Sequence, residues 1–239
     1  MNQQHALFRL ENLWYSYQPG GTRQLDIPFL ELREHECVAL LGPNGSGKTT
    51  ILKLLNYLLP CQGTPQHSGG TLLFRGQPYI RRVARSCSVY LHQHPWMLRG
   101  TVAENLAAAR GHTGLVRSGT LYCDMDTVAW ALQAVGLDGQ EQRAARALSG
   151  GEAQRLALAR VLASGREVLL LDEPTANVDQ ASASLIERSL CQIRKQRTIL
   201  FATHDRMLAE RLADRIIVCG EEVKLMERRK QSAYELAPR

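Results

Sequence analysis

The sequence predicts an α/β fold, and three observations carry that prediction. A short apolar run at residues 38–41 leads through a glycine-rich loop, 42–50, into apolar residues at helical spacing over 51–59. Two later apolar runs, 168–171 and 198–202, each end in polar or acidic residues. Strands of this kind deliver functional groups to the carboxyl edge of a sheet, where α/β proteins bind ligands.

The composition is that of an ordinary globular protein. At 239 residues, the chain is long enough for one large domain or for a core with a subdomain. Apolar residues make up 44% and charged residues 22%, so no fibrous or disordered class is indicated. The net charge of +6 suits phosphate ligands or an anionic membrane surface, and a slightly basic solvated surface explains it equally well.

Cysteine spacing and hydropathy exclude further classes. The six cysteines are scattered without a CxxC pair, so neither a zinc site nor a disulfide framework is predicted, and a reducing compartment is favoured. Residues 1–5 are polar, so we expect no signal peptide. No apolar run approaches the roughly 20 residues that a membrane span needs. We therefore expect a chain that does not cross a bilayer by itself.

The N-terminal residues predict an antiparallel β layer ahead of the glycine-rich loop. Residues 6–17 alternate loosely and are rich in aromatic side chains, a turn follows at 19–21, and apolar residues alternate again over 25–32. An aromatic side chain in this layer is placed to stack on a nucleobase. Tyr17 is the first choice and Tyr15 the second, and ordinary packing is the alternative for either.

The glycine-rich loop predicts a phosphate cradle. Glycines lack a Cβ, so backbone N–H groups can turn inward, and the following helix adds about half a positive charge. Lys48 supplies a cation for the β- and γ-phosphates, and the Thr49 hydroxyl is placed to hold Mg²⁺. A turn that binds nothing is the alternative, and the acidic strand end described below argues against it. The loop consists of Gly42, Pro43, Asn44, Gly45, Ser46, Gly47, Lys48, Thr49 and Thr50.

The middle of the chain alternates loops and short strands before a helical insert. Residues 61–70 predict a loop, 71–74 a strand and 75–78 a turn, and 88–91 a buried strand that delivers Gln93 onto a loop. Three basic residues fit the solvated face of a helix: Arg81, Arg82 and Arg85.

Residues 101–147 predict the helical insert. Thr101 offers a capping hydroxyl and Glu104 an early acid, so a helix is expected to start here. Residues 110–124 contain three glycines and look irregular, and Asp126 is expected to cap the next helix. No internal repeat or long linker interrupts the chain, so a single domain is predicted.

A second glycine-rich helix start follows the insert at Leu148, Ser149, Gly150, Gly151 and Glu152. Its free N–H groups and serine hydroxyl form another anion-binding end. One helix N-terminus already faces phosphate at Lys48. The simplest use for the second is therefore the far side of the same nucleotide, presented by a second copy of the protein.

The apolar run 168–171 ends in two acids. Asp172 is placed to hold Mg²⁺, usually through water, and Glu173 to polarise an attacking water. A strand ending in solvated acids is the alternative, and the nearby phosphate loop argues against it. His204, after the strand at 198–202, could reach a γ-phosphate, although a lone histidine is more often a structural hydrogen-bonding group.

The C-terminal residues predict the end of the sheet. Apolar residues at 216–218 and again at 223–225 predict two closing strands. From Arg228 onward the chain is polar and is expected to be a mobile tail.

Together these motifs resemble the ATP-binding cassette ATPases over nearly the whole chain. The resemblance implies a P-loop NTPase core with an N-terminal antiparallel β layer, in one domain, 1–239, with a helical subdomain inserted at about 95–160. Two departures touch no catalytic role: His35-Glu36 stands in place of Gly-Glu, and Asn177-Val178 in place of Ala-Leu. The matching motifs are the Walker A loop at 42–50, the Q-loop Gln93, the signature at 148–152, the Walker B strand at 168–172 with Glu173, the D-loop ending at Asp179, and the switch His204.

The resemblance also implies a head-to-tail dimer with two ATP molecules between the subunits. Catalysis is assigned to Glu173, His204 and Gln93, and Mg²⁺ to Thr49, Gln93 and Asp172. Nucleotide binding is assigned to the loop 42–50 and to Tyr17, Ser149, Gly150, Gly151, Glu152 and Asp179.

Residues 90–98 and 101–105 resemble compact importer ATPases, including those for tungstate, molybdate or phosphate. This implies a homodimer at the cytoplasmic face of the inner membrane, integral membrane permease subunits whose coupling helices dock near Gln93, and an extracytoplasmic solute-binding protein. An exporter ATPase and a soluble scaffold ATPase, as in iron–sulfur cluster assembly, are the alternatives. Nucleic acid is not an expected partner. Members of the family that act on chromosomes separate the two motifs with long coiled coils, and no heptads separate Lys48 from Ser149 here. Members that act on ribosomes usually carry two cassettes in one chain, and this sequence has one.

Overall fold

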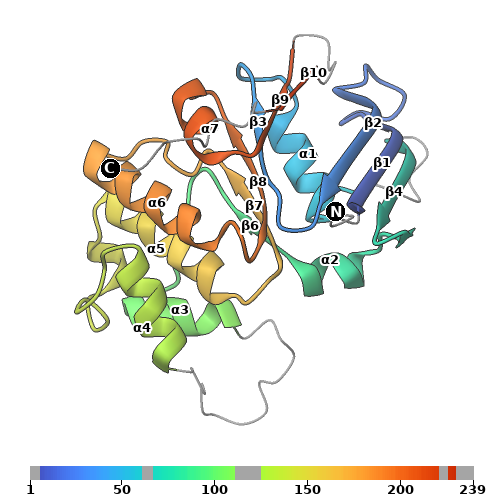
Figure 1. Cartoon of the computed structure of the whole chain (residues 1–239). Coiled ribbons are helices and arrows are strands. Elements are labelled where there is room, and N and C mark those ends of the chain that lie inside the picture. The colour runs from blue at the N-terminus through green and yellow to red at the C-terminus, as the bar shows by residue number, and fades with distance from the viewer. Residues whose placement is uncertain (1–5, 61–66, 111–124, 221–225, 230–239) are drawn as a thin grey trace.

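The computed structural model describes residues 6–60, 67–110, 125–220 and 226–229. Within them, the chain forms two β-sheets, and helices cover both faces of the larger sheet (Figure 1). The predicted α/β fold is thereby confirmed. Among the described helices, none combines the length and the apolar character that a membrane crossing requires.

The smaller sheet is the predicted antiparallel layer. Its strand order is β2-β1-β4-β5. Strand β4 begins three residues before the predicted strand at 71–74, and Gln77–Pro78 pair with β4 where a turn was expected. The strands are β1 (Ala6–Tyr15), β2 (Leu25–Arg33), β4 (Ser68–Phe74) and β5 (Gln77–Pro78).

The larger sheet has the order β10-β9-β3-β8-β7-β6, and only β10 runs antiparallel to its neighbour. Both faces are buried, because successive residues of β8 alternate between two core clusters. Ile199 and Phe201 pack toward α3–α7, and Leu200 and Ala202 toward α1 and the antiparallel sheet. The strands are β3 (Cys37–Leu41), β6 (Ser88–Leu91), β7 (Val168–Asp172), β8 (Thr198–Thr203), β9 (Arg215–Val218) and β10 (Met226–Arg229).

The helices divide between the two faces of this sheet. Figure 1 shows α3 to α6 gathered on one side, away from α1 and the antiparallel sheet. The Thr101 hydroxyl accepts from the backbone N–H of Glu104 at 3.2 Å at the start of α3, as predicted. The helices are α1 (Lys48–Leu55), α2 (Arg81–Cys87), α3 (Val102–Arg110), α4 (Met125–Ala134), α5 (Gly150–Ala163), α6 (Gln180–Ile193) and α7 (Arg206–Leu212).

Two further predicted boundaries differ from the structure. Helix α4 is described from Met125, so Asp126 lies within the helix and not at its N-cap. Among the described residues, the last strand is Met226–Arg229, so Arg228 and Arg229 pair with β9 where a tail was predicted. Predictions at 61–66, 111–124 and 221–225 lie outside the described residues.

Candidate functional site

The glycine-rich loop joins the end of β3 to the start of α1. Gly45 and Gly47 have φ values of +84° and +86°, which only glycine adopts without strain. A Cβ on Gly42 would collide with the carbonyl oxygen of Cys219. The glycines are therefore required for the loop to fold back over the sheet edge.

Lys48 and Ser46 give this loop its affinity for an anion. The Lys48 Nζ donates to the carbonyl oxygens of Gly42 and Pro43, both at 2.8 Å, and the residue is only 6% exposed. The Ser46 hydroxyl is buried and has no hydrogen-bond partner among the described residues. A buried polar atom beside a fixed ammonium group fits a phosphate oxygen.

Two hydroxyls meet the Asp172 carboxylate at the end of β7. The Thr49 hydroxyl lies 3.0 and 2.9 Å from its two oxygens, and the Tyr90 hydroxyl donates to Oδ2 at 2.7 Å. Burial and this hydrogen bond hold the pKa of Tyr90 above its ordinary value, so the phenol stays a donor. A hydroxyl beside a carboxylate is a donor set that suits Mg²⁺.

Tyr90 was not among the predicted site residues. The sequence offers one signal for Tyr90. It lies in a predicted buried strand, where a tyrosine hydroxyl usually finds a hydrogen-bond partner.

Glu173 and His204 meet at the ends of neighbouring strands. The Oε1 of Glu173 lies 3.0 Å from Nδ1 of His204, whose side chain is 65% exposed, whereas Glu173 is buried. Glu173 has a φ of +49°, a conformation that costs a non-glycine residue energy and that clusters at functional sites. The backbone N–H of Glu173 donates to the carbonyl of Ala202 at 3.0 Å, which holds this conformation in place.

Lys48, Asp172 and Glu173 line one cavity of about 300 Å³, whereas His204 is not among its described lining residues. Tyr17 lines it and is 49% exposed, and its hydroxyl lies 3.0 Å from that of Thr50. Tyr15 is buried and packs edge-on against Tyr17 at 5.1 Å, so ordinary packing accounts for it. Gln24, which the sequence did not single out, accepts from the Tyr17 backbone N–H at 3.1 Å. The lining residues are Tyr17, Gln24, Asn44, Gly45, Ser46, Gly47, Lys48, Thr49, Thr50, Gln93, Asp172 and Glu173.

The second glycine-rich turn is capped within the chain. The Ser149 hydroxyl accepts from the Glu152 N–H at 3.3 Å, and Glu152 Oε2 accepts from the Ser149 N–H at 2.7 Å. Arg143 donates to Oε1 of Glu152 at 2.6 Å. Hydrogen bonds from Arg143 and from the Ser149 backbone lower the pKa of Glu152 to about 2. Sequence reasoning missed Arg143, which no motif marks.

The structure does not bring this turn to the cavity of its own chain. Ser149, Gly150, Gly151 and Glu152 are absent from the described cavity lining, and so is Asp179. Asp179 instead caps α6 by accepting from the Ser182 N–H at 2.9 Å. A Cβ on Gly151 would lie 3.1 Å from the Asp179 carboxylate, so these predicted nucleotide-binding residues form a separate group.

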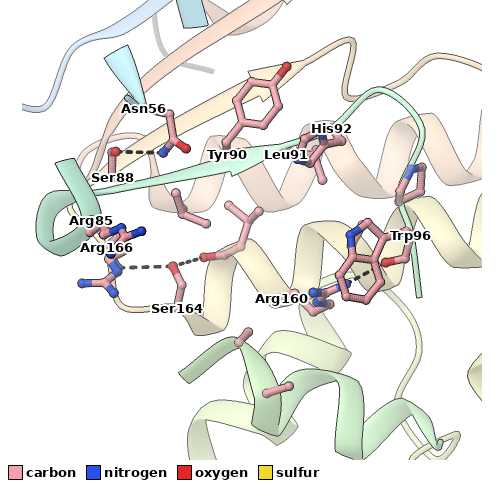
Figure 2. Close-up of a pocket in the computed structure, with 16 residues that line it drawn as sticks. Asn56, Arg85, Ser88, Tyr90, Leu91, His92, Trp96, Arg160, Ser164 and Arg166 are labelled. Carbon is pink, nitrogen blue, oxygen red and sulfur yellow. Dashed lines mark hydrogen bonds between the residues drawn. The ribbon is translucent and has the colours of Figure 1, made fainter. Parts of the chain in front are cut away.

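A larger groove of about 600 Å³ lies beside the edge strand β6, and Figure 2 shows its lining. Trp96 is 61% exposed, and Arg160 lies over its ring at 5.5 Å and donates to its carbonyl at 2.9 Å. Arg85 and Arg166 also line the groove, and no acid is among its described lining residues. This surface is therefore aromatic and cationic.

The fold and the cavity define a nucleoside-triphosphate-binding α/β protein. The family model described as ABC transporter matches residues 25–176. The chain belongs to this family, as an ATP-binding subunit of the kind whose ATP hydrolysis is coupled to transport. The resemblance found in the motifs is thereby confirmed.

Several import proteins are similar over most of this chain. The thiamine import ATP-binding protein ThiQ of Chelativorans sp. is 36% identical over 218 residues, which are 90% of this chain and 84% of ThiQ. The phosphonates import ATP-binding protein PhnC of Alcaligenes faecalis is 31% identical, over 88% of this chain and 79% of PhnC. The Fe(3+) ions import protein FbpC of Streptomyces coelicolor is 38% identical over 83% of this chain, which spans 56% of FbpC.

Solved structures agree on the fold. CbiO1 from Clostridium perfringens, part of the ABC transporter complex CbiONQ, has a TM-score of 0.77 and 26% identity, over 93% of this chain and 87% of CbiO1. A bacterial Atm1-family ABC exporter with ATP bound has a TM-score of 0.74 and 23% identity, over 92% of this chain and 38% of the exporter chain, and shows the fold alone.

Proposed function

We propose that this chain is the ATP-hydrolysing subunit of a solute importer, and that it drives separate membrane subunits. The observation that carries the proposal is the convergence of Lys48, Asp172 and Glu173 on one cavity. Lys48 and the N–H groups of loop 42–50 bind the phosphates, and Tyr17 stacks on the adenine. This function fits a single domain with a helical subdomain at about 95–160.

Residues at or near the strand ends bind the metal and activate the reacting water. Thr49, Asp172 and Gln93 hold Mg²⁺, which neutralises charge on the β- and γ-phosphates when bound. Glu173 accepts a proton from the water that attacks the γ-phosphorus. His204 holds one oxygen of Glu173 through the 3.0 Å contact, which leaves the other oxygen for the water. Gln93, in the loop that follows β6, completes the set of residues around the γ-phosphate.

A second copy completes each site. The turn at Ser149 is exposed and lies apart from the cavity of its own chain, so Ser149, Gly150 and Gly151 bind the γ-phosphate held by a partner subunit. Asp179 lies beside Gly151 of this turn, and Glu152 accepts from the Ser149 N–H. Two ATP molecules then lie between two subunits, and hydrolysis opens the dimer.

The groove beside β6 is the proposed docking site for a membrane subunit. It contains Trp96 and three arginines, which suit a helix with apolar and acidic side chains. The names of the relatives support import. The proposal adds peripheral attachment at the cytoplasmic face of the inner membrane and a solute-binding protein in the same system. An oxyanion cargo stays a prediction, since PhnC fits it and ThiQ and FbpC do not.

Glu173→Gln tests the hydrolytic role. We expect turnover to fall on the order of 10²- to 10⁴-fold, because the amide cannot accept the proton. Nucleotide binding should persist and trap a dimer, measured by calorimetry and by light scattering with ATP and Mg²⁺. Glu210→Gln, at an exposed acid of α7, is the matched control and should behave like the parent. A monomeric Glu173→Gln variant with full activity would contradict the proposal.

Recovery from membranes separates the importer from a soluble ATPase. Extraction of the native complex in mild detergent should recover an integral membrane protein with this chain. Recovery of soluble partners alone would exclude the transport role while leaving the ATPase assignment standing.

A further inference from the structure

Tyr90 joins the two hollows of the molecule. Its hydroxyl donates to Asp172, which lines the nucleotide cavity, and Tyr90 is itself among the residues that line the groove beside β6 (Figure 2). Among the described lining residues, none belongs to both hollows. Tyr90 therefore connects them through one hydrogen bond.

The direction of this hydrogen bond is fixed by the sheet. Tyr90 pairs with Leu170 in the parallel β6–β7 ladder, and Asp172 is two residues further along β7. Side chains two residues apart point to the same face of a sheet, so the phenol and the carboxylate meet there. The ring of His92, another residue of the groove lining, packs edge-on against Tyr90 at 4.6 Å and 90°, which restrains the phenol ring.

The two donors to Asp172 have different roles. Thr49 belongs to the phosphate loop and is itself a proposed ligand of Mg²⁺. Tyr90 approaches from the neighbouring strand and leaves the remaining lone pairs of the carboxylate to other partners, because an ionised carboxylate has about four acceptor sites. Hydrogen-bond partners of this kind orient the carboxylates that hold metals.

We propose that Tyr90 is a positioning residue, whose hydroxyl holds the Asp172 carboxylate in the orientation that binds Mg²⁺. The inference rests on the proposed function, in which Asp172 holds the metal. It assigns to Tyr90 an effect on metal-dependent nucleotide binding and none on binding without metal.

Tyr90→Phe tests this by removing only the hydroxyl. The readout is calorimetric binding of AMP-PNP, a non-hydrolysable ATP analogue, once with Mg²⁺ and once with EDTA. We expect the gain in affinity from Mg²⁺ to shrink about tenfold, while affinity in EDTA is unchanged. In an Asp172→Asn background, Tyr90→Phe should have no further effect. Tyr90→Met removes the same donor with a flexible side chain, and replaces Tyr90→Phe if that variant does not melt cooperatively.

Tyr79→Phe is the matched control. It removes another buried tyrosine hydroxyl, which donates to the Leu55 carbonyl, and it should leave the Mg²⁺ gain unchanged. An unchanged gain in the Tyr90 variants, or an equal loss with Mg²⁺ and with EDTA, would overturn the role of Tyr90. If the parent chain itself gains no affinity from Mg²⁺, the proposed function fails first, so the two failures are distinguishable.

Discussion

The two helix N-termini that the sequence marks for anions are built in opposite ways. Helix α1 begins after Gly47, which has no side chain to cap it, so its first N–H groups are left to a ligand or solvent. Helix α5 begins after Ser149, which forms a reciprocal capping box with Glu152. The first N–H groups of α1 therefore need acceptors from a ligand or solvent. Those of α5 are largely satisfied by side chains of the chain itself.

The burial of the residues around these two helix N-termini differs in the same way. Lys48 and Asp172 are buried beside the α1 terminus, whereas Ser149 and Gly150 are exposed. A buried cationic loop suits a ligand held within one subunit. An exposed terminus that is rigid before binding suits presentation to another subunit, because little ordering is lost on contact. The difference fits the proposed shared site, in which one terminus binds the nucleotide and the other is presented by a partner subunit.

Ser149→Arg gives the largest expected effect on this comparison. The arginine adds bulk and removes the hydroxyl where the partner's γ-phosphate is proposed to bind. ATP hydrolysis should fall on the order of a hundredfold, which is typical when a preorganised donor is lost. Binding of AMP-PNP to the single subunit should not change, because Ser149 does not line the cavity. Steady-state ATPase assays and calorimetry measure the two quantities.

Gln192→Arg controls for the added charge, since Gln192 is exposed on α6. The melting temperature of Ser149→Arg must also be measured, because loss of an N-cap costs about 1 kcal/mol. A folded Ser149→Arg variant that hydrolyses ATP at the parent rate would show that the two termini do not share a site.

Lys48→Ala tests the terminus that binds the nucleotide. Loss of one charge-assisted contact should weaken nucleotide affinity on the order of thirtyfold, or about 2 kcal/mol. Lys53→Ala removes the same charge from the same helix outside the described cavity lining, and should bind nearly as tightly as the parent. Equal affinities of the Lys48 and Lys53 variants would remove the reason for calling the α1 terminus a phosphate cradle.

Local signals in the sequence predicted the fold and the positions of most candidate site residues. The apolar run before Asp172 indicates a buried strand, and such a strand brings its last residues to the ligand-binding edge. The glycines at 45 and 47 indicate a loop that no other residue builds without strain. The strand at 88–91 was predicted with the same bounds that β6 has.

Contacts across long separations were not predictable. The Tyr90–Asp172 bond joins residues 82 positions apart, and it depends on which strands are neighbours and on their register. The Trp96–Arg160 contact joins a loop to α5 over 64 positions. The pairing of Arg228 and Arg229 with β9, where a tail was predicted, has the same cause.

Arg143→Gln gives the smallest expected effect and tests how the Ser149 turn is held in place. Arg143 is the main cause of the low pKa of Glu152, about 2, so its loss should return that pKa toward the ordinary value of about 4.3. The Arg143 side chain is 38% exposed, and screening limits the cost at pH 7 to about 1 kcal/mol or less. The melting temperature should therefore fall by about 2–4 °C.

The sign of the pH dependence identifies the cause. A carboxyl with a depressed folded pKa contributes stability above its unfolded pKa, and that contribution is lost as the pH falls toward the folded value. The difference in melting temperature between parent and Arg143→Gln should be full at pH 6 and shrink below about pH 4.3. Arg206→Gln breaks the exposed pair with Glu210 and should change little at either pH. Parallel melting curves for parent and Arg143→Gln at every pH would mean that the Ser149 turn is held by its capping box alone.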